Sequence, residues 1–178
     1  IPSVDKIFGP GNIWVDTAKQ MVSSDGVAID LPAGPTEVAL LIDATANPAF
    51  VAADMLAQAE HDVLSDVLVV ALEGFNVAEL EKHVASQLAS LPRKDIAEKV
   101  IDRARVVLVD STDHALALIK RYAPEHLIIQ MHHAELIAEQ IQHAGSVFIG
   151  EWTPESLGDY ASGTNHTLAT NGAARAFS

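Results

Sequence analysis

The chain has 178 residues, 49% of them hydrophobic, and its 24 acidic residues against 11 Lys and Arg give a formal net charge of −13. This length fits one domain or parts of two, and the charge argues against nucleic acid as a partner, because phosphate binding needs a basic face. Cysteine is absent, which excludes disulfides and thiolate metal sites. No apolar run approaches the roughly 20 residues of a membrane span, and no signal peptide is recognisable. We therefore expect a small, neutral or cationic ligand, no membrane partner and a cytoplasmic location; the alternative is that the negative charge only keeps the protein soluble.

Apolar runs and helical stripes alternate along the chain. The first helix is expected around residues 13–23, a short strand at 27–31, and then a near-continuous apolar strand at 38–44, typical of a strand covered on both faces. Asn47 and Pro48 form an N-cap followed by proline at the first helical position, and this helix is expected to end near residue 61. The remaining predicted elements are strands at 67–72, 106–109, 127–130 and 146–149, and helices at 76–91, 94–103, after Ser111, and at 135–143.

Strands separated by helices indicate βαβ units. We therefore expect an α/β fold with a mainly parallel sheet and helices on both faces, of an incomplete Rossmann-like kind. Functional loops are then expected beyond the carboxyl ends of the strands. A domain crossing is expected at residues 32–35, where two prolines and a glycine separate two strands. Beyond Gly150 the sequence is loop-like.

The helix after Asn47 carries polar residues at helical spacing. Asp54, Gln58 and His61 are four and three residues apart, so they share one face, while Val51 and Met55 can face the core. Imidazole is a common zinc ligand and an amide oxygen a rarer one. The alternative is a solvated polar face with one surface histidine.

Two further segments carry groups suited to proton transfer or metal binding. Glu125 and His126 precede an apolar strand, and a carboxylate with an imidazole can share two proton transfers; the alternative is an exposed charged pair. Residues 150–166 form a long polar segment after a strand, where loops are often functional. There Asp159 offers an oxygen ligand, and His166 a nitrogen ligand or proton carrier; the alternative is a surface loop.

Two turns complete the set of candidates. Residues 8–12, Phe-Gly-Pro-Gly-Asn, precede a helix, and glycines there can let a phosphate approach backbone N–H groups. They do not form the dinucleotide-binding glycine fingerprint, and a plain turn is the alternative. Residues 33–37, Ala-Gly-Pro-Thr-Glu, present a hydroxyl and a carboxylate, or are simply a tight turn.

Taken together, the motifs resemble the histidinol dehydrogenase family in order and spacing. The resemblance covers essentially the whole chain, and its last motif is long and specific. It suggests a central segment of such an enzyme, truncated at both ends. The motifs are Phe-Gly-Pro-Gly-Asn at 8–12, Ala-Gly-Pro-Thr-Glu at 33–37, Gln-Ala-Glu-His at 58–61, Pro-Glu-His-Leu at 124–127 and Gly-Asp-Tyr-Ala-Ser-Gly-Thr-Asn-His at 158–166.

The resemblance implies a role for each matching residue. Zinc is expected to be held by Gln58, His61 and Asp159, with a fourth ligand, a histidine of the partner subunit in a homodimer, matched by nothing in this chain. Glu125 and His126 are implied as the bases. The residues implied to contact histidinol are Thr36, Gln58, His61, His126, Asp159 and His166, and Asn12 is implied to contact NAD.

The resemblance also implies the reaction and the domains. Histidinol would be oxidised to histidine in two steps, each passing a hydride to NAD, with His126 accepting the hydroxyl proton and Glu125 activating water in between. Residues 1–35 would end a dinucleotide-binding Rossmann-like domain, and residues 36–178 would form part of the zinc- and substrate-binding one. The chain alone is expected to be inactive.

The chain departs from the family pattern at two positions. Thr36 stands where members usually have Ser, which adds a methyl group, and Ala169 stands where they usually have Pro, which is expected to leave that loop looser; neither removes a ligand. The alternative functions are a zinc hydrolase, in which Glu125 activates water directly, and a non-catalytic nucleotide- or metabolite-binding domain.

Overall fold

The computed structural model describes residues 2–9, 13–31, 34–163 and 168–177. Its strands are β1 (Lys6–Ile7), β2 (Ala28–Ile29), β3 (Glu37–Ile42), β4 (Asp66–Leu72), β5 (Arg105–Val109), β6 (His126–Gln130) and β7 (Ser146–Ile149). Its helices are α1 (Ile13–Ser24), α2 (Pro48–Ala59), α3 (Val77–Leu88), α4 (Lys94–Ile101), α5 (Thr112–Tyr122), α6 (Ala134–Ala138), α7 (Ser156–Tyr160) and α8 (Ala174–Phe177). No helix among the described residues is long and apolar enough to cross a membrane.

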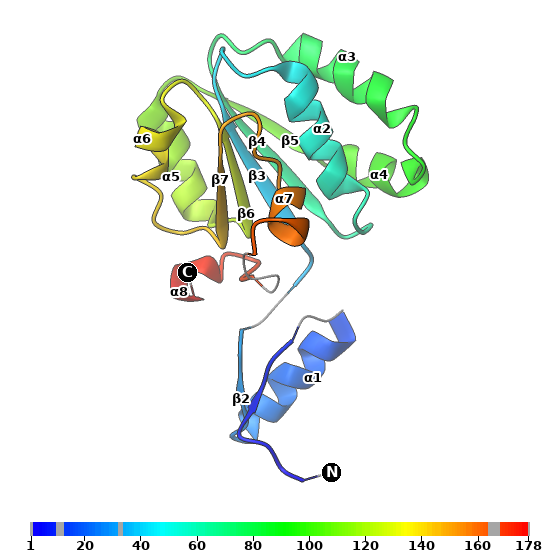
Figure 1. The fold of residues 1–178 in the computed structure, drawn as a ribbon, viewed down its shortest axis with the longest axis vertical. Coiled ribbons are helices and arrows are strands. Elements are labelled where there is room, and N and C mark those ends of the chain that lie inside the picture. Colours follow the sequence, from blue (N-terminus) through cyan, green and yellow to red (C-terminus); the bar gives the residue numbers. More distant parts are fainter. Residues whose placement is uncertain (1, 10–12, 32–33, 164–167, 178) are drawn as a thin grey trace.

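A five-stranded sheet in the order β5-β4-β3-β6-β7 forms the centre of the molecule, and all its strand pairs are parallel (Figure 1). Chain order runs outward from β3 to β4 and β5 on one side, and then to β6 and β7 on the other. This reversal beside β3 is the switch point of a doubly wound sheet. The predicted α/β class with a mainly parallel sheet is therefore confirmed.

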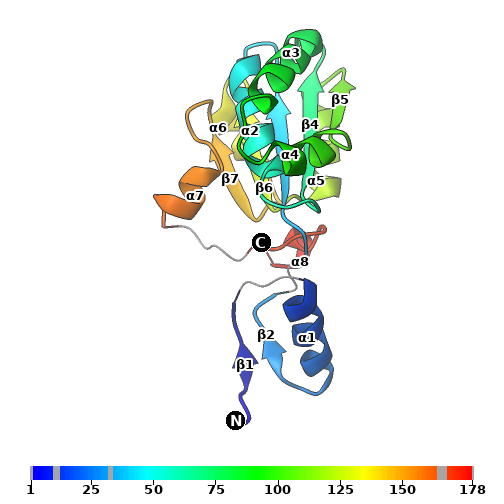
Figure 2. The same cartoon turned by 90° about the vertical axis from the view of Figure 1, so that its right-hand side faces the viewer.

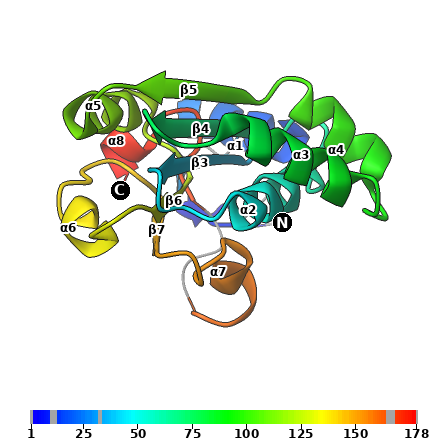
Figure 3. The ribbon, with the colours of Figure 1, turned by 90° about the horizontal axis from the view of Figure 1, so that it is seen from above.

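Helices cover both faces of this sheet. Alternate residues of β3 point to opposite faces, so Val38, Leu40 and Ile42 pack with α2, α3 and α4, whereas Ala39 and Leu41 pack with α5 and α6. Figure 3 shows the two sets of helices on either side of the strands. All six residues of β3 are buried, which explains why residues 38–42 are an unbroken apolar run rather than an alternating one.

The predicted caps begin the helices where expected. The side chain of Asn47 accepts a hydrogen bond from Ala49 N with Pro48 at the first helical position, Asn76 accepts one from Glu79 N, and Ser111 accepts one from His114 N. Each cap satisfies a backbone donor that the first turn leaves open. The position at which α2 begins is therefore fixed by the Asn47 cap.

Four elements, α6, α7, α8 and β1, differ from the sequence prediction. The helix predicted at 135–143 ends at Ala138, and beyond it the chain leads to the start of β7, where Gly145 N donates to Pro124 O. The segment predicted as loop beyond Gly150 contains α7, which holds Gly158, a poor helix former, and α8. The two-residue strand β1 was not predicted.

Residues 2–31 form a small separate layer, in which β1 pairs with β2 in parallel and α1 packs beside them. Figure 2 shows this unit extending from the end of the large sheet at which its strands begin, with α8 near the junction. Inside it, Lys19 is buried and forms an ion pair with Asp30. Burial opposes the charge of Asp30, but the hydrogen bonds from Lys19, Gly9 N and Leu31 N outweigh it and lower its pKa to about 2.

Candidate functional site

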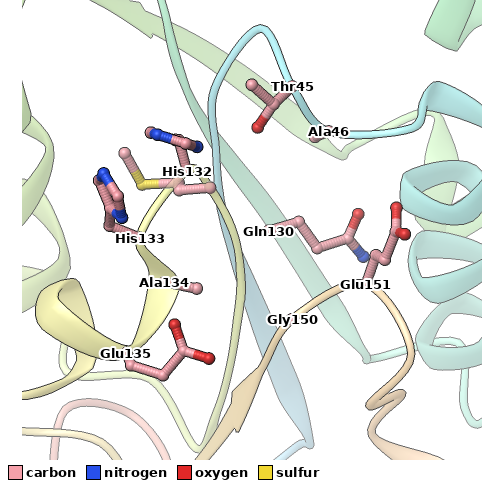
Figure 4. Close-up of a pocket in the computed structure, with 10 residues that line it drawn as sticks. Thr45, Ala46, Gln130, His132, His133, Ala134, Glu135, Gly150 and Glu151 are labelled. Atoms are coloured by element: carbon pink, nitrogen blue, oxygen red, sulfur yellow. The ribbon is translucent and has the colours of Figure 1, made fainter.

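A pocket of about 340 Å³ lies beyond the carboxyl ends of β6 and β7, near the switch point. Figure 4 shows His132, His133 and Glu135 on one side of it and Gln130 with Glu151 on the other. Of the candidate site residues within the described part of the chain, none lines this pocket. Thr36, Glu125 and His126 instead lie at the opposite, amino edge of the sheet, where β3 and β6 begin.

The acid–base pair lies where β6 begins. Glu125 immediately precedes this strand and His126 is its first residue, and their exposed fractions are 7% and 9%. Glu125 Oε2 lies 3.7 Å from His126 Nδ1, so both side chains face one place although they are adjacent in the chain. The alternative of an exposed charged pair is therefore wrong.

Thr36 and Glu37, at the start of β3, hold the carboxylate of Glu125. Thr36 Oγ1 donates to Glu125 Oε2 over 2.7 Å, and Glu37 N donates to the same oxygen over 3.0 Å. The strand register brings Glu37 and Glu125 side by side, because β3 and β6 are neighbours and Val38 is paired with His126. Two donors fix one oxygen of Glu125 and leave its position well defined.

Two polar residues of α2, Asp54 and Gln58, are buried, and Asp54 is bonded to β6. Asp54 accepts a 2.7 Å hydrogen bond from Gln130 Nε2, and Asp54 and Gln58 are 8% and 0% exposed. Burial raises the pKa of Asp54 to about 7, and the bond from Gln130 offsets part of that rise. The alternative of a solvated polar face is therefore wrong for these two residues, whereas His61, two residues beyond α2, is exposed.

The Asp54–Gln130 bond sets the level of α2 on the sheet. Gln58 lies one helical turn, about 6 Å, nearer the amino edge than Asp54. His126 lies four residues, about 13 Å, nearer that edge than Gln130, on the same face of β6. Gln58, His61 and His126 therefore belong to one face and one edge of the sheet.

The segment between β7 and α7 adds a carboxylate to which the sequence analysis gave no role. Glu155 is buried, and its Oε1 lies 4.0 Å from His126 Nδ1. The sequence marked residues 150–166 as a polar segment, but only the fold shows which carboxylate approaches the imidazole. The carboxylates of Glu125 and Glu155 thus both approach the Nδ1 side of the His126 ring.

Three candidate residues cannot be compared with the rest in full. Asp159 belongs to α7, beyond β7 (Figure 3). His166 and Asn12 lie outside the described residues. Within the described part of the chain, no three His, Asp or Glu side chains form a group that could hold a metal ion.

Comparison with known proteins decides the family. A sequence model of histidinol dehydrogenase matches residues 1–178. The chain belongs to the histidinol dehydrogenase family. It is 54% identical over 178 residues to histidinol dehydrogenase of Bacteroides thetaiotaomicron and 50% identical over 179 residues to that of Xanthomonas axonopodis pv. citri. Each match covers the whole of this chain, which spans only 42% of each relative's length.

Solved structures agree with this assignment. The crystal structure of histidinol dehydrogenase from Elizabethkingia anophelis superposes with a TM-score of 0.94 at 49% identity, covering 99% of this chain and 41% of that one. A propionaldehyde dehydrogenase from Clostridium phytofermentans gives a TM-score of 0.58 at 15% identity, covering 97% of this chain and 52% of that one. The second likeness concerns the fold alone.

The side chain of Gln58 suits the role of zinc ligand that the resemblance to histidinol dehydrogenases implies. Neither Oε1 nor Nε2 of Gln58 has a hydrogen-bond partner among the described residues, although the side chain is fully buried. A buried amide without partners is unfavourable by about 1–3 kcal/mol. A metal ion at Oε1 would satisfy it, so this residue fits a ligand role.

Proposed function

We propose that this chain supplies the zinc- and substrate-binding part of a histidinol dehydrogenase, which oxidises L-histidinol to L-histidine in two NAD-linked steps of histidine biosynthesis. The observation that carries the proposal is the buried pair Glu125–His126 on the same edge and face of the sheet as the unpartnered amide of Gln58. Family membership supplies the reaction, and these residues supply groups that can perform its proton transfers.

Zinc would be held by Gln58, His61 and Asp159, with a fourth histidine from the partner subunit of a homodimer. Bound there, zinc would orient and polarise the alcohol, and bound NAD would accept the hydride. Asn12 would contact NAD. We further propose that residues 1–35 end the dinucleotide-binding domain, that residues 36–178 form part of the zinc- and substrate-binding domain, and that the protein is cytoplasmic, in keeping with its lack of cysteine.

His126 would accept the proton of the substrate hydroxyl in each oxidation. An imidazole suits this transfer because its ordinary pKa of about 6.5 lies near neutral pH. Glu125 would take a proton from water, so that hydroxide adds to the aldehyde, and the resulting oxyanion would take back the proton that His126 accepted in the first oxidation. This gives the hydrate oxidised in the second step and returns His126 to its neutral form. Its carboxylate is held for this by Thr36 Oγ1 and Glu37 N. The hydroxyl of Thr36 and the imidazole of His166 would also contact substrate.

The test is an assay of a protein of the relatives' full length that contains this chain. Wild type should reduce two NAD per histidinol, and His126→Asn should lower turnover by about 10²-fold or more while zinc content stays unchanged. His83→Asn, on the exposed side of α3, is the matched control. Retained turnover in His126→Asn would refute the base role. Hydrolysis without NAD would favour a zinc hydrolase, and absence of bound metal a non-catalytic binding domain.

The 178-residue chain offers a second test by calorimetric zinc titration. It carries three of the four proposed ligands, so we expect weak zinc binding that His61→Ala removes and His83→Ala leaves intact. We expect no histidinol oxidation by this chain alone. Tight zinc binding that survives His61→Ala would contradict the ligand assignment.

A further inference from the structure

Glu37 is a buried carboxylate to which the proposed reaction gives no part. It is the first residue of β3 and is only 6% exposed. Its Oε1 accepts a 3.1 Å hydrogen bond from Asn171 N, and the neighbouring backbone N–H groups of Glu125 and Gly172 also lower its pKa. These donors come from two segments that are far apart in sequence.

Glu37 and Glu125 interact through both backbone and side chain. Glu37 N donates to the carboxylate of Glu125 over 3.0 Å, and the backbone N–H of Glu125 is close enough to the carboxylate of Glu37 to lower its pKa. The two residues are therefore in direct contact where β3 and β6 begin. Removing the Glu37 carboxylate would release the backbone at the residue that carries the proposed water-activating group.

The second segment, residues 168–172, follows the Gly-Thr-Asn-His motif directly in sequence. Besides its bonds to Glu37, this segment receives a 2.5 Å hydrogen bond from Gly34 N to Thr170 Oγ1. A Cβ added at Gly34 would collide with Asn171 and meet Thr170 Oγ1 at 3.1 Å. The turn before β3 and the segment 168–172 are therefore in close contact, with Glu37 at their centre.

The environment of Glu37 is unfavourable to a carboxylate in other respects. Burial raises its pKa to about 7, with a further rise from Asp66 and a partial offset from the backbone donors. Asp66 is itself bound by Arg105 and by the hydroxyl of Tyr122. A group of this kind is kept at a cost in stability, which is typical of residues that serve a site rather than the core.

We propose that Glu37 is a positioning residue of this site: its carboxylate holds the backbone of Glu125 and of residues 171–172 together, so that the acid–base pair and the segment after the Gly-Thr-Asn-His motif meet in one arrangement. Its effect on turnover rests on the proposed function. Its effect on the backbone does not, because that is a property of the fold.

The experiment uses the full-length protein with Glu37→Gln, which keeps the shape but replaces one acceptor oxygen with a donor. Glu73→Gln, an exposed residue at the opposite edge of the same sheet, is the matched control. Hydrogen exchange is followed by mass spectrometry in peptides covering residues 123–127 and 168–174. The other readouts are kcat and KM for histidinol, and the fraction folded by circular dichroism.

In Glu37→Gln we expect exchange in both peptides to be about tenfold faster or more, because the N–H groups lose their acceptor. We expect kcat to fall by about 10–100-fold with KM within about threefold, because a small misplacement of catalytic groups costs that much. Glu73→Gln should match wild type. If Glu37→Gln does not fold, Glu37→Asp, which keeps the charge but is one methylene shorter, is expected to give the same pattern.

Unchanged exchange in both peptides would overturn the proposal. So would faster exchange with unchanged kcat, or a loss of kcat that only follows a loss of folded protein. If wild type does not oxidise histidinol, the proposed function fails, and exchange at residues 123–127 and 168–174 alone decides whether Glu37 holds these segments.

Discussion

Thr36 donates its hydroxyl to the same oxygen of Glu125 that receives the N–H of Glu37, over 2.7 Å and 3.0 Å. Thr36→Val keeps the shape of the side chain but removes the hydroxyl donor. We expect kcat/KM for histidinol to fall by about 10–100-fold in Thr36→Val, from the loss of a hydrogen bond to a charged group. Steady-state kinetics of the full-length protein would measure this.

Two variants sharpen the Thr36 test. Thr36→Ser keeps the donor and should stay within about threefold of wild type. Thr45→Val removes an exposed hydroxyl bound to Asp43 at the carboxyl edge and should leave kinetics unchanged. Equal activity in Thr36→Val and Thr36→Ser would mean that the hydroxyl has no part in holding Glu125.

Gly145 packs against the backbone of the acid–base pair. A Cβ at this position would lie 2.6 Å from the carbonyl oxygen of Glu125, which itself accepts from Ser146 N over 2.8 Å. Backbone cannot move aside as a side-chain end can, so Gly145→Ala should destabilise the protein by about 1–3 kcal/mol and reduce turnover. Thermal unfolding and the same kinetic assay would measure both effects. A variant with wild-type melting temperature and kcat would show that the β6–β7 junction tolerates displacement.

Much of the fold follows from local sequence. The buried run of β3 and the caps Asn47, Asn76 and Ser111 are local signals, and the structure has strands and helices where they predict them. The end of α6 at Ala138 has no such local signal, since Gly145, which the sequence marks as the break, lies seven residues further on. Two-residue strands such as β1 carry too little periodicity to be predicted.

The candidate site was predictable only in its parts. Helical spacing placed Asp54 and Gln58 on one face, but their burial depends on Gln130, which is 76 positions from Asp54 in sequence. The sequence marks Glu37 only as the carboxylate of a turn and gives Glu155 no role, because a carboxylate in a turn or polar loop is ordinarily solvated. Their roles depend on contacts with Glu125 and His126, which only the order of strands β3, β6 and β7 brings about.

Gln58 should reveal a conflict between stability and metal binding. Since both its amide atoms are buried without partners among the described residues, Gln58→Met should raise the free energy of unfolding of the metal-free chain by about 1–2 kcal/mol. The same change should abolish the zinc binding that we propose. Chemical denaturation and zinc titration would measure the two effects.

Gln87 supplies the matched control for that experiment. Its Nε2 donates to Ala49 O over 2.9 Å, so Gln87→Met loses a satisfied hydrogen bond and should lower stability slightly without affecting zinc binding. A Gln58→Met chain that is less stable than wild type without metal would argue that the amide has partners in solution, and would weaken its assignment as a ligand.

Asp54 should make stability depend on pH in a direction opposite to that of a salt-bridged carboxylate. Burial raises its pKa from 3.8 to about 7 in the folded chain, so between these values the folded state holds a proton that the unfolded state releases. Stability from this group therefore falls as pH rises from about 4 and is at its lowest above pH 7, with a total change of roughly 2–4 kcal/mol.

Asp54→Asn cannot ionise and should lack this decline. From pH 5 to pH 8, we expect the free energy of unfolding of wild type to fall relative to that of Asp54→Asn. Urea denaturation at each pH would measure this. Glu37, whose pKa is also raised to about 7, contributes equally to both proteins and cancels. Asp113→Asn, an exposed carboxylate in the first turn of α5, is the control and should give parallel curves. Parallel curves for Asp54→Asn as well would mean that water or rearrangement of α2 solvates Asp54, and that the α2–β6 contact is looser than the Gln130 hydrogen bond indicates.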